Sequence, residues 1–442
     1  MSFTFADLFA GIGGFHAALA KHGGEPAFVS EIDTNAGEIY SKNWLEKSEH
    51  ILHGDITQLT EGSVQVPRHN VLTGGFPCQP FSKSGNQHGV AEARGTLFYN
   101  ILRIIEAKKP ELILLENVRN LIGPKHIGDY RTMIRLIREL GYVVSDEPTI
   151  LSPHEIPEKL GGSPQHRERI FIGAVRLDKK KAAQYQNISP VLPRHPFAGY
   201  GPIEWDLAHY LEKYASGLQS DAEKLAISSE QRRALQVWND FVKLNHRENG
   251  KPLPGLPLWT EYWKPRAEIR IPSSMPEWKR RFIERNSDFY VTNREWIDPW
   301  LYRANLDSLI PSYRKFEWQA QSNRDIYKCL IQFRPSGIRV KAATYVPTFV
   351  AMAQTPIIGW EKRSLSVSEA KALQGFGKSF KFGDQRDNLS FKQIGNAVHV
   401  GVASIVFQSL VRRARDLEQE WACSLKINNS QIANLPNSPL IL

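Results

Sequence analysis

Short apolar runs alternate with helical patterns along the first part of the chain. The runs cover residues 4–9, 27–30, 71–74, 112–116, 142–150 and 169–175, and their lengths and flanking turn residues are typical of strands. Between two of them, Tyr130, Met133, Ile134, Ile137 and Leu140 recur at helical spacing and predict one buried helix face. Strands that alternate with helices predict a mostly parallel sheet covered by helices, which is an α/β domain.

This alternation is lost between about residues 176 and 345. Proline clusters such as Lys251-Pro-Leu-Pro-Gly-Leu-Pro257 lie among aromatic residues there, so we expect a second domain of irregular architecture. After residue 365 a helical stretch leads to Ile394-Gly-Asn-Ala-Val398 and to an apolar helix over residues 400–410. From about residue 418 the tail is polar, and we expect it to be loosely ordered.

Composition narrows the class of protein. The 442 residues are 41% hydrophobic, which is enough for a large core and for two or three domains. No apolar run reaches the roughly 18 residues of a membrane span, and the first residues lack the basic flank of a signal peptide. We therefore expect a cytoplasmic protein with no membrane partner. The net charge of +10 favours a polyanionic partner, although many basic proteins bind no nucleic acid.

A glycine-rich segment follows the first predicted strand. Asp7-Leu-Phe-Ala-Gly-Ile-Gly-Gly-Phe15 has the residues of a strand that ends in a tight turn and opens a helix. Glycines let the backbone approach a ligand closely, although the spacing is not G-x-G-x-x-G and a turn without a ligand fits as well. Glu31, after the second strand, is placed to bind ribose hydroxyls, and Asp55 is placed to bind an adenine amino group. Either acid alone is more often a helix cap or a surface charge.

One cysteine stands in an unusual segment. Gly74-Gly-Phe-Pro-Cys-Gln-Pro-Phe-Ser82 places Cys78 in a proline-flanked loop after a hydrophobic strand. A lone cysteine is usually a buried structural thiol, but the two prolines and the glutamine favour a shaped, partly open loop. The three cysteines, Cys78, Cys329 and Cys423, form no close pair, so we expect no disulfide framework, no zinc site and no other metal.

The segment Leu112-Ile-Leu-Leu-Glu-Asn-Val118 ends an apolar strand with a carboxyl group. Ligands of a parallel sheet lie beyond the carboxyl ends of its strands, so Glu116 belongs in the same cleft as Gly11 and Cys78. Apolar surroundings raise the pKa of a carboxyl group, and we therefore expect Glu116 to serve as an acid.

Together these segments resemble the C5-cytosine-specific DNA methyltransferases of bacterial restriction-modification systems. The resemblance covers nearly all of residues 3–177 and 358–412, in the family's order. The matching segments are residues 7–15, Glu31, Gly54-Asp-Ile56, the Pro-Cys-Gln loop at 77–79, Arg94-Gly-Thr-Leu-Phe98, Glu116-Asn-Val118, Gln165-His-Arg-Glu-Arg169, Leu373-Gln-Gly-Phe376 and Gly395-Asn-Ala-Val398. Nine such segments in one order are hardly a product of chance.

The resemblance implies a class I S-adenosylmethionine-dependent methyltransferase fold. This fold is a Rossmann-like, mostly parallel sheet with helices on both faces, here joined to a smaller, irregular target-recognition domain. We expect a catalytic and cofactor-binding domain over residues 1–177 and a target-recognition domain with its hinge over residues 178–380. A helix over residues 381–415 is expected to return to the catalytic domain, and residues 416–442 to form the tail.

The resemblance also implies S-adenosyl-L-methionine as the methyl donor and S-adenosyl-L-homocysteine as its product. The family often has an aromatic side chain over the adenine at the position of Ile32, so this sequence keeps hydrophobic cover with weaker stacking. The residues that would line the cofactor pocket are Phe9, Gly11, Ile12, Gly14, Glu31, Ile32, Asp55, Ile56, Pro77, Leu97 and Asn396.

Carbon 5 of cytosine is too weak a nucleophile to accept a methyl group unaided. The resemblance implies that the Cys78 thiolate adds to carbon 6 while Glu116 protonates or hydrogen-bonds ring nitrogen N3. A free cysteine has a pKa of about 8.5, so nearby positive charge is needed to populate the thiolate. Arg167 and Arg169 resemble the pair that holds the cysteine loop and the target base, and either one can supply that charge. The sequence identifies no base for the carbon 5 proton.

Carbon 6 is shielded inside a duplex, so the cytosine of a specific short double-stranded site must be flipped out. The segment after Cys78 is small and polar and is expected to close over the DNA, although an ordinary surface loop fits its lysine and serines. In the second domain, residues 333–341 form a basic run that favours contact with the DNA backbone over a plain solvated strand. The residues expected to contact DNA are Gln79, Ser82, Lys83, Ser84, Arg94, Arg334, Arg339 and Lys341.

Two other functions stay open at this point. An RNA methyltransferase of the same fold shares these motifs, and the large recognition region favours DNA. A catalytically silent DNA-binding regulator is the second, and an intact Cys78 and Glu116 argue against it. We expect a monomer that acts beside a restriction endonuclease or another phage-defence protein. The sequence reveals neither the DNA site nor the defence system.

Overall fold

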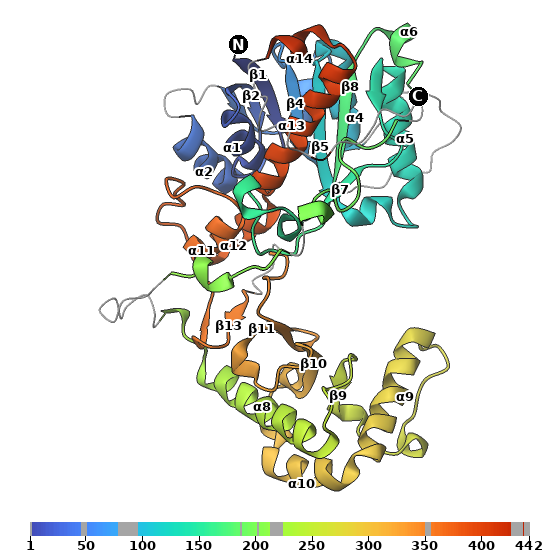
Figure 1. The fold of residues 1–442 in the computed structure, drawn as a ribbon, viewed down its shortest axis with the longest axis vertical. Coiled ribbons are helices and arrows are strands. Elements are labelled where there is room, and N and C mark those ends of the chain that lie inside the picture. Colours follow the sequence, from blue (N-terminus) through green and yellow to red (C-terminus); the bar gives the residue numbers. More distant parts are fainter. Residues whose placement is uncertain are drawn as a thin grey trace. The chain divides into compact units, whose positions relative to one another are not determined.

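The computed structural model describes residues 2–45, 51–77, 96–185, 188–200, 203–212, 224–349, 355–425 and 436. The chain forms two compact units (Figure 1). Unit 1 comprises Met1–Trp205 and Ala370–Leu442, and unit 2 comprises Asp206–Glu369.

These boundaries differ from the expected ones at residues 177/178 and 380/381, because segments on both sides pack on unit 1. The Leu192 amide donates to Thr149 Oγ1 at 3.3 Å, and Arg413 donates to the Ser189 carbonyl at 2.8 Å. Ser163 Oγ donates to the Leu373 carbonyl at 2.7 Å. Residues 188–205 and 370–380 are therefore part of unit 1 rather than of unit 2.

Unit 1 is built around a sheet in the order β3-β2-β1-β4-β5-β8-β6, with β7 also paired to β8. The strands from β3 to β5 are parallel, whereas β8 is antiparallel to β5, β6 and β7. The strands are β1 (Phe3–Leu8), β2 (Gly24–Ser30), β3 (Leu52–His53), β4 (Val71–Gly75), β5 (Leu112–Val118), β6 (Tyr142–Val144), β7 (Thr149–Leu151) and β8 (Arg169–Arg176).

The single strand expected over residues 142–150 is two strands, β6 and β7. The segment between them, Ser145-Asp-Glu-Pro148, combines turn-forming polar residues with a proline, which has no amide hydrogen for a ladder. The other expected strands agree with the structure to within a few residues.

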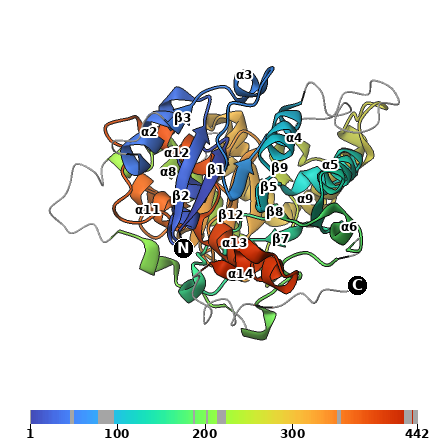
Figure 2. The same ribbon diagram turned by 90° about the horizontal axis from the view of Figure 1, so that it is seen from above.

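Helices cover both faces of this sheet (Figures 1 and 2). The side chains of β1 show how the two faces are covered, because alternate side chains of a strand point to opposite faces of the sheet. Phe3 stacks on Phe407 of α13 at 5.3 Å, and Phe5 meets His16 of α1 at 5.3 Å. Ala6 and Leu8 instead join the core cluster under α4 and α5. The helices are α1 (Gly14–Ala20), α2 (Thr34–Trp44), α3 (Ile56–Thr60), α4 (Leu97–Lys108), α5 (Ile127–Glu139), α6 (Lys179–Ala182), α12 (Asp387–Asn396), α13 (Val400–Asp416) and α14 (Glu420–Ser424).

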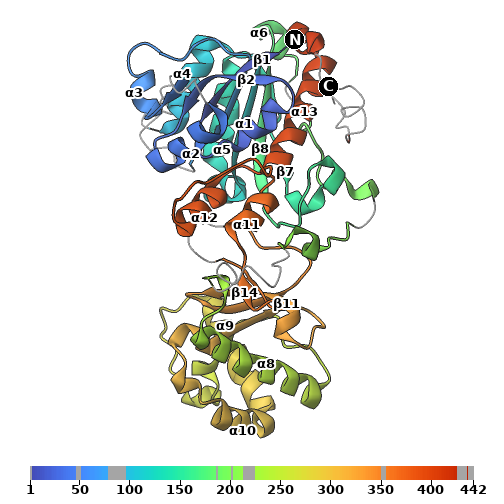
Figure 3. The ribbon, with the colours of Figure 1, turned by 90° about the vertical axis from the view of Figure 1, so that its left-hand side faces the viewer.

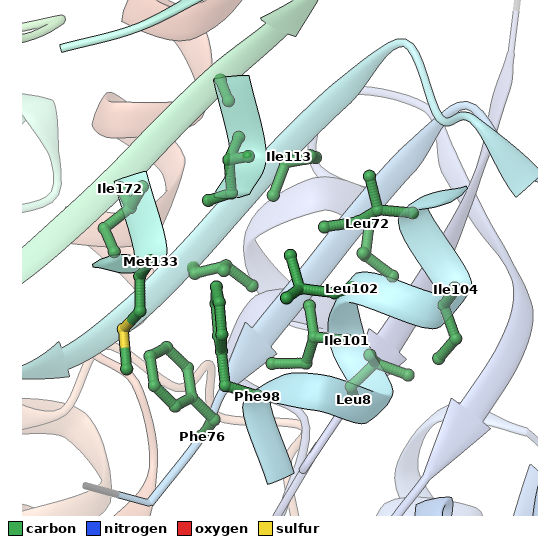
Figure 4. Packing of buried hydrophobic residues seen from close by; sticks show 14 of the residues in the cluster. Leu8, Leu72, Phe76, Phe98, Ile101, Leu102, Ile104, Ile113, Met133 and Ile172 are labelled. Atoms are coloured by element: carbon green, nitrogen blue, oxygen red, sulfur yellow. The ribbon is translucent and has the colours of Figure 1, made fainter. Parts of the chain in front are cut away.

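Helix α4 shows why these elements form where they do. Thr96 caps its first turn by accepting a hydrogen bond from the Tyr99 amide at 3.3 Å. Phe98, Ile101 and Leu102 follow at helical spacing and are fully buried against the sheet (Figure 4). Because α4 packs so closely against the strands, it holds the edge of the sheet at which the parallel strands end in a fixed position.

One stretch of unit 1 is long and apolar enough to cross a membrane, Asp387–Asp416. However, 89% of its most apolar 18-residue segment is buried inside the protein, as is typical of a helix in the core of a folded domain. It comprises α12 and α13, which pack within unit 1.

Unit 2 is more regular than the sequence suggested. Its sheet has the order β14-β13-β11-β12-β10-β9, and of these neighbours only β10 and β12 are parallel. Figure 3 labels two of its strands, β11 and β14. Trp238 stacks on Phe316 at 4.6 Å and anchors a core of tryptophans, while the prolines at 251–257 lie between α8 and β9. The elements are β9 (Leu258–Trp259), β10 (Lys315–Gln319), β11 (Cys329–Arg334), β12 (Gly337–Ala342), β13 (Ile357–Ile358), β14 (Arg363–Ser364), α8 (Ser229–Asn249), α9 (Glu277–Thr292) and α10 (Arg294–Ala304). Helix α11 (Val367–Leu373) contains the boundary with unit 1.

Candidate functional site

The glycine-rich segment forms a tight turn between β1 and α1. Phe9, Gly11 and Gly13 have φ angles of 55°, 54° and 87°, a left-handed conformation that costs non-glycine residues free energy. Two contacts hold the turn: the Ala10 amide donates to the Ser30 carbonyl at 3.0 Å, and Trp44 Nε1 donates to the Ile12 carbonyl at 2.9 Å. The turn therefore presents its backbone in a fixed shape at the edge of the sheet.

Gly14 begins α1 and packs closely against the backbone of Val398. A Cβ atom at Gly14 would lie 2.4 Å from the Val398 carbonyl oxygen, closer than real contacts allow. Only glycine therefore lets α1 approach the segment before α13.

Glu31 directly follows β2 and holds the glycine-rich turn through a hydrogen bond. Its Oε2 atom accepts from the Gly11 amide at 2.7 Å, and its Oε1 atom accepts from the Asp33 amide at 2.8 Å. Burial raises the pKa of Glu31, although these amide hydrogen bonds oppose the rise. Because a carboxylate oxygen can accept more than one hydrogen bond, Glu31 can also accept from hydroxyl groups of a ligand.

Asp55 is a helix cap, as its plainer interpretation predicted. Its Oδ1 atom accepts from the Thr57 amide at 2.9 Å at the start of α3. It also lines the same cleft as Glu31.

These residues line a cleft of about 490 Å³ in unit 1. It lies where β1, β2, β4 and β5 end, the edge at which open α/β sheets bind ligands. Every expected cofactor residue except Gly14 lines it. These are Phe9, Gly11, Ile12, Glu31, Ile32, Asp55, Ile56, Pro77, Leu97 and Asn396.

The cleft has further walls that the sequence analysis missed. Most of these additional residues are next to expected residues in the chain. The motifs could therefore have been used to predict them. Lys392 and Gln393 are different, because they lie about one helical turn before the expected Asn396 and outside the matching segment 395–398. The additional residues are Ser30, Asp33, Ala36, Gly54, Gly75, Phe76, Asn117, Val118, Lys392, Gln393 and Gly395.

Glu116 and Arg169 meet in the cleft. Arg169 Nε lies 3.1 Å from Glu116 Oε1, and both side chains are largely buried. Burial raises the pKa of Glu116, while the charges of Arg169 and Arg167 oppose the rise. The result is a carboxyl group that holds a proton more strongly than an ordinary glutamic acid.

Arg167 is buried beside this pair and holds the wall of the cleft. Its Nη2 atom donates to the Ala397 carbonyl at 2.8 Å, and Gln374 Nε2 donates to the same oxygen at 2.7 Å. Gln165 in turn donates to Gln374 at 3.1 Å. Burial lowers the pKa of Arg167 to about 9, and the charge of Arg169 contributes. This network fixes the position of Asn396, the residue before Ala397.

A second buried polar group lies behind the glycine turn. Thr73 Oγ1 donates to Asp7 Oδ1 at 2.9 Å, and His16 Nδ1 shares a hydrogen bond with the Tyr40 hydroxyl at 2.7 Å. Burial raises the pKa of Asp7 to about 7, and the charge of Glu31 adds to this rise. These two hydrogen bonds join β1 to β4 and α1 to α2 in the interior of unit 1.

Cys78, Gln79, Ser82, Lys83, Ser84 and Arg94 lie outside the described residues, which resume at Thr96. The expected roles of these residues thus stay predictions. Pro77, to which Cys78 is bonded, lines the cleft.

The basic residues expected to contact DNA in unit 2 are partly engaged with an acid. Arg339 Nε lies 2.8 Å and Arg334 Nη1 3.6 Å from Glu317 Oε2 on β10. Lys341 Nζ lies 5.0 Å above the ring of Tyr345. All three are half-buried on β11 and β12, so their role in DNA binding stays a prediction.

Within the described ranges no group of three or more histidine, cysteine, aspartate or glutamate side chains is arranged to hold a metal ion. Of the two cysteines there, Cys329 is buried in the core of unit 2 and Cys423 is exposed.

Comparisons with known proteins agree with one another. The family model of C-5 cytosine-specific DNA methylases matches residues 3–412. The Type II methyltransferase M.AluI of Cellulosimicrobium cellulans is 36% identical over 512 residues, which cover 99% of this chain and 97% of that protein. M.HhaI of Haemophilus parahaemolyticus is 41% identical over 174 residues, which cover 39% of this chain and 49% of that protein. A structure of Spodoptera frugiperda DNMT2 shares the fold, with a TM-score of 0.50 at 17% identity over 92% of this chain and 99% of that one.

Proposed function

The chain belongs to the family of C-5 cytosine-specific DNA methylases, and on that premise we propose how its residues carry out the reaction. It is a DNA (cytosine-5-)-methyltransferase with a class I methyltransferase fold. Our proposal concerns the cofactor, the catalytic residues and the DNA. S-adenosyl-L-methionine binds in the cleft of unit 1, and the methyl group goes to a cytosine flipped out of a specific short double-stranded site.

The residues of the cleft fit S-adenosyl-L-methionine. A volume of about 490 Å³ is in the range of ligand pockets. The Glu31 carboxylate would accept from the ribose hydroxyls, and Asp55 would accept from the adenine amino group. Ile32 and Ile56 would cover the adenine, and the glycine turn would lie along the methionine part. When bound, the cofactor supplies an electrophilic methyl group on a sulfonium.

Cys78 is the nucleophile of the proposed reaction. Its thiolate forms a bond to carbon 6 of cytosine, the electron pair of the ring double bond moves to carbon 5, and carbon 5 becomes an enamine carbon able to attack a methyl group. Carbon 5 would take the methyl group from the sulfonium, which would leave as the thioether S-adenosyl-L-homocysteine. A base then takes the proton of carbon 5, its electron pair re-forms the double bond between carbons 5 and 6, and the bond between sulfur and carbon 6 breaks to release the thiolate. Pro77, the residue bonded to Cys78, lines the cleft, which supports this assignment.

Glu116 is the acid that assists this addition. Charge develops on N3 of the ring as sulfur adds to carbon 6, and a proton held by Glu116 neutralises it. The raised pKa of Glu116 suits this task, because the carboxyl group must hold a proton near neutral pH. Arg169 orients the carboxyl group through its contact at 3.1 Å.

Double-stranded DNA is the proposed partner of unit 2, with Arg334, Arg339 and Lys341 as contact residues. The same proposal includes the cysteine loop, with Gln79, Ser82, Lys83, Ser84 and Arg94. We propose a monomeric, cytoplasmic enzyme that protects DNA in a restriction-modification or related defence system. Its relationship to the Type II methyltransferase M.AluI over nearly the whole of both chains supports this role.

The observation that carries the proposed chemistry is the Glu116–Arg169 pair inside the cleft that holds Glu31 and Asn396. The test is transfer of tritiated methyl groups from S-adenosyl-L-methionine to duplex DNA and, separately, to transfer RNA. We expect label in duplex DNA and, by bisulfite sequencing, 5-methylcytosine at one short site. Label in RNA alone, or 5-methylcytosine at no fixed site, would overturn the proposal.

A further inference from the structure

Lys392 lies on the wall of the cleft and reaches across to the opposite side. It belongs to α12, near the end of unit 1, and its Nζ atom lies 3.4 Å from Asp33 Oδ2 at the start of α2. Both residues line the cleft. Their side chains are 46% and 35% exposed, so the pair stands at the rim rather than in the core.

Helix α2 is held by the C-terminal part of the chain at both ends, but unequally (Figures 1 and 3). Near its C-terminus, Asn43 exchanges two hydrogen bonds of 2.8 Å with the backbone of Lys381, and Trp44 packs on Phe380 at 5.7 Å. At its N-terminus the ion pair between Asp33 and Lys392 joins it to α12. The end of α2 that borders the cleft is therefore joined to the C-terminal part of the chain by a partly exposed ion pair, and the other end by two hydrogen bonds and an aromatic contact.

Ile32, the residue before Asp33, indicates which part of the cleft the ion pair covers. Ile32 lines the cleft and is 70% exposed, an unusual position for a large apolar side chain. Glu31, one residue earlier, is the proposed ribose acceptor. The ion pair consequently stands over the adenosine end of the proposed cofactor site.

We propose that Lys392 and Asp33 form a latch across the mouth of the cleft that retains the adenosine end of S-adenosyl-L-methionine. This inference rests on the proposed function of the cleft. Lys392 and Asp33 are positioning residues, since they act on cofactor retention and not on the reacting atoms. A latch of this kind compensates for the limited cover that the aliphatic side chain of Ile32 gives to a flat aromatic base.

The test compares three variants that keep the shape of the site. Lys392→Met keeps the length of the side chain without its charge, and Asp33→Asn keeps the oxygen that caps α2 by accepting from Ala36. The third is the double variant. Because exposed ion pairs contribute about 0.2–1 kcal/mol, each variant should weaken the Kd for S-adenosyl-L-methionine by a factor of about 1.4 to 5. The measurements are calorimetric Kd values and steady-state KM and kcat on duplex DNA.

The proposed latch predicts three further results. The double variant should be no weaker than either single variant, because all three lack the same ion pair. Lys392→Arg should restore affinity, and salt should weaken the wild type towards the variants. Lys381→Ala, an exposed lysine that does not line the cleft, is the matched control and should bind like the wild type.

The results separate this inference from the proposed function. Unchanged affinity in Lys392→Met, or effects in the double variant that simply add, would overturn the latch while methyl transfer continues. Loss of thermal stability equal to the loss of affinity would also overturn it, since that result indicates a structural contact. If the wild-type protein binds no S-adenosyl-L-methionine, the proposed function itself fails.

Discussion

Arg169 Nε lies 3.1 Å from Glu116 Oε1 at the junction of two antiparallel strands. β5 delivers the carboxyl group and β8 delivers the guanidinium. Burial alone would raise the pKa of Glu116, and the positive charges of Arg169 and Arg167 limit that rise. The two strands thus set together how firmly the proposed catalytic acid holds its proton.

Replacing Glu116 by glutamine should lower kcat by about 10²- to 10⁴-fold, because the amide cannot transfer a proton to the ring. The alkaline limb of the kcat/KM profile should also disappear, since no carboxyl group is left to lose its proton. Single-turnover methyl transfer at several pH values measures both effects. An unchanged rate in Glu116→Gln would rule out its role as the acid.

Replacing Arg169 by methionine removes a charge that lowers the pKa of Glu116. The pKa should therefore rise further, and the alkaline limb of the profile should move to higher pH while the rate falls. Arg176→Met is the matched control, because Arg176 lies at the other end of β8 and pairs with Glu111 at 3.1 Å. A shift of equal size in that control would contradict the assignment.

Replacing Cys78 by serine should reduce methyl transfer by several orders of magnitude, because a serine hydroxyl is a far weaker nucleophile than a thiolate at neutral pH. The wild type should form a covalent complex with duplex DNA that contains 5-fluorocytosine, and Cys78→Ser should form none. Cys423→Ser, at an exposed cysteine, should behave like the wild type. Equal rates in Cys78→Ser and the wild type would exclude the covalent mechanism.

Two glycines of the turn should respond differently to alanine. Gly14→Ala places a methyl group 2.4 Å from the Val398 carbonyl oxygen and should cost about 1–3 kcal/mol of stability through overpacking. At Gly11 no atom lies within 4 Å of the new methyl group, so the cost is the left-handed φ of 54°, about 1–2 kcal/mol. Because Gly11 lines the cleft, its alanine variant should lose more cofactor affinity relative to stability. Chemical denaturation and calorimetry compare the two.

The stability of unit 1 should depend on the protonation of Asp7. Its pKa is raised from 3.8 to about 7 in the folded protein, so it binds a proton more tightly folded than unfolded. Its contribution is fully present below pH 3.8 and is lost as the pH rises through about 7. Asp7→Asn does not titrate, and its stability relative to the wild type should therefore increase between pH 6 and pH 8. Denaturant unfolding at those two pH values measures the difference, and a pH-independent difference would contradict the assigned pKa.

Much of unit 1 follows from local sequence patterns. Apolar runs such as 112–116 predict buried strands, and their order places Glu31, Asp55 and Glu116 at one edge of the sheet. The break between β6 and β7 was missed, because two apolar runs joined by a short polar turn look like one strand.

The parts that escaped prediction depend on contacts between distant segments. Lys392 and Asp33 are far apart in the chain, and neither carries a motif that indicates the ion pair. The boundary near Trp205 depends on where residues 188–205 pack, which no local pattern records. The sheet of unit 2 was also missed, since β9, β13 and β14 are only two residues long and most of its regular structure comes from packing around Trp238.

The cleft takes one wall from residues 9–56 and another from residues 392–396. A ribosome adds the second wall long after the first, so the nascent chain has no complete cleft until α12 has left the exit tunnel. Any transcript that stops before Lys392 yields a product without this wall. Such a chain would lack one side of the proposed cofactor pocket, and we expect it to bind the methyl donor poorly.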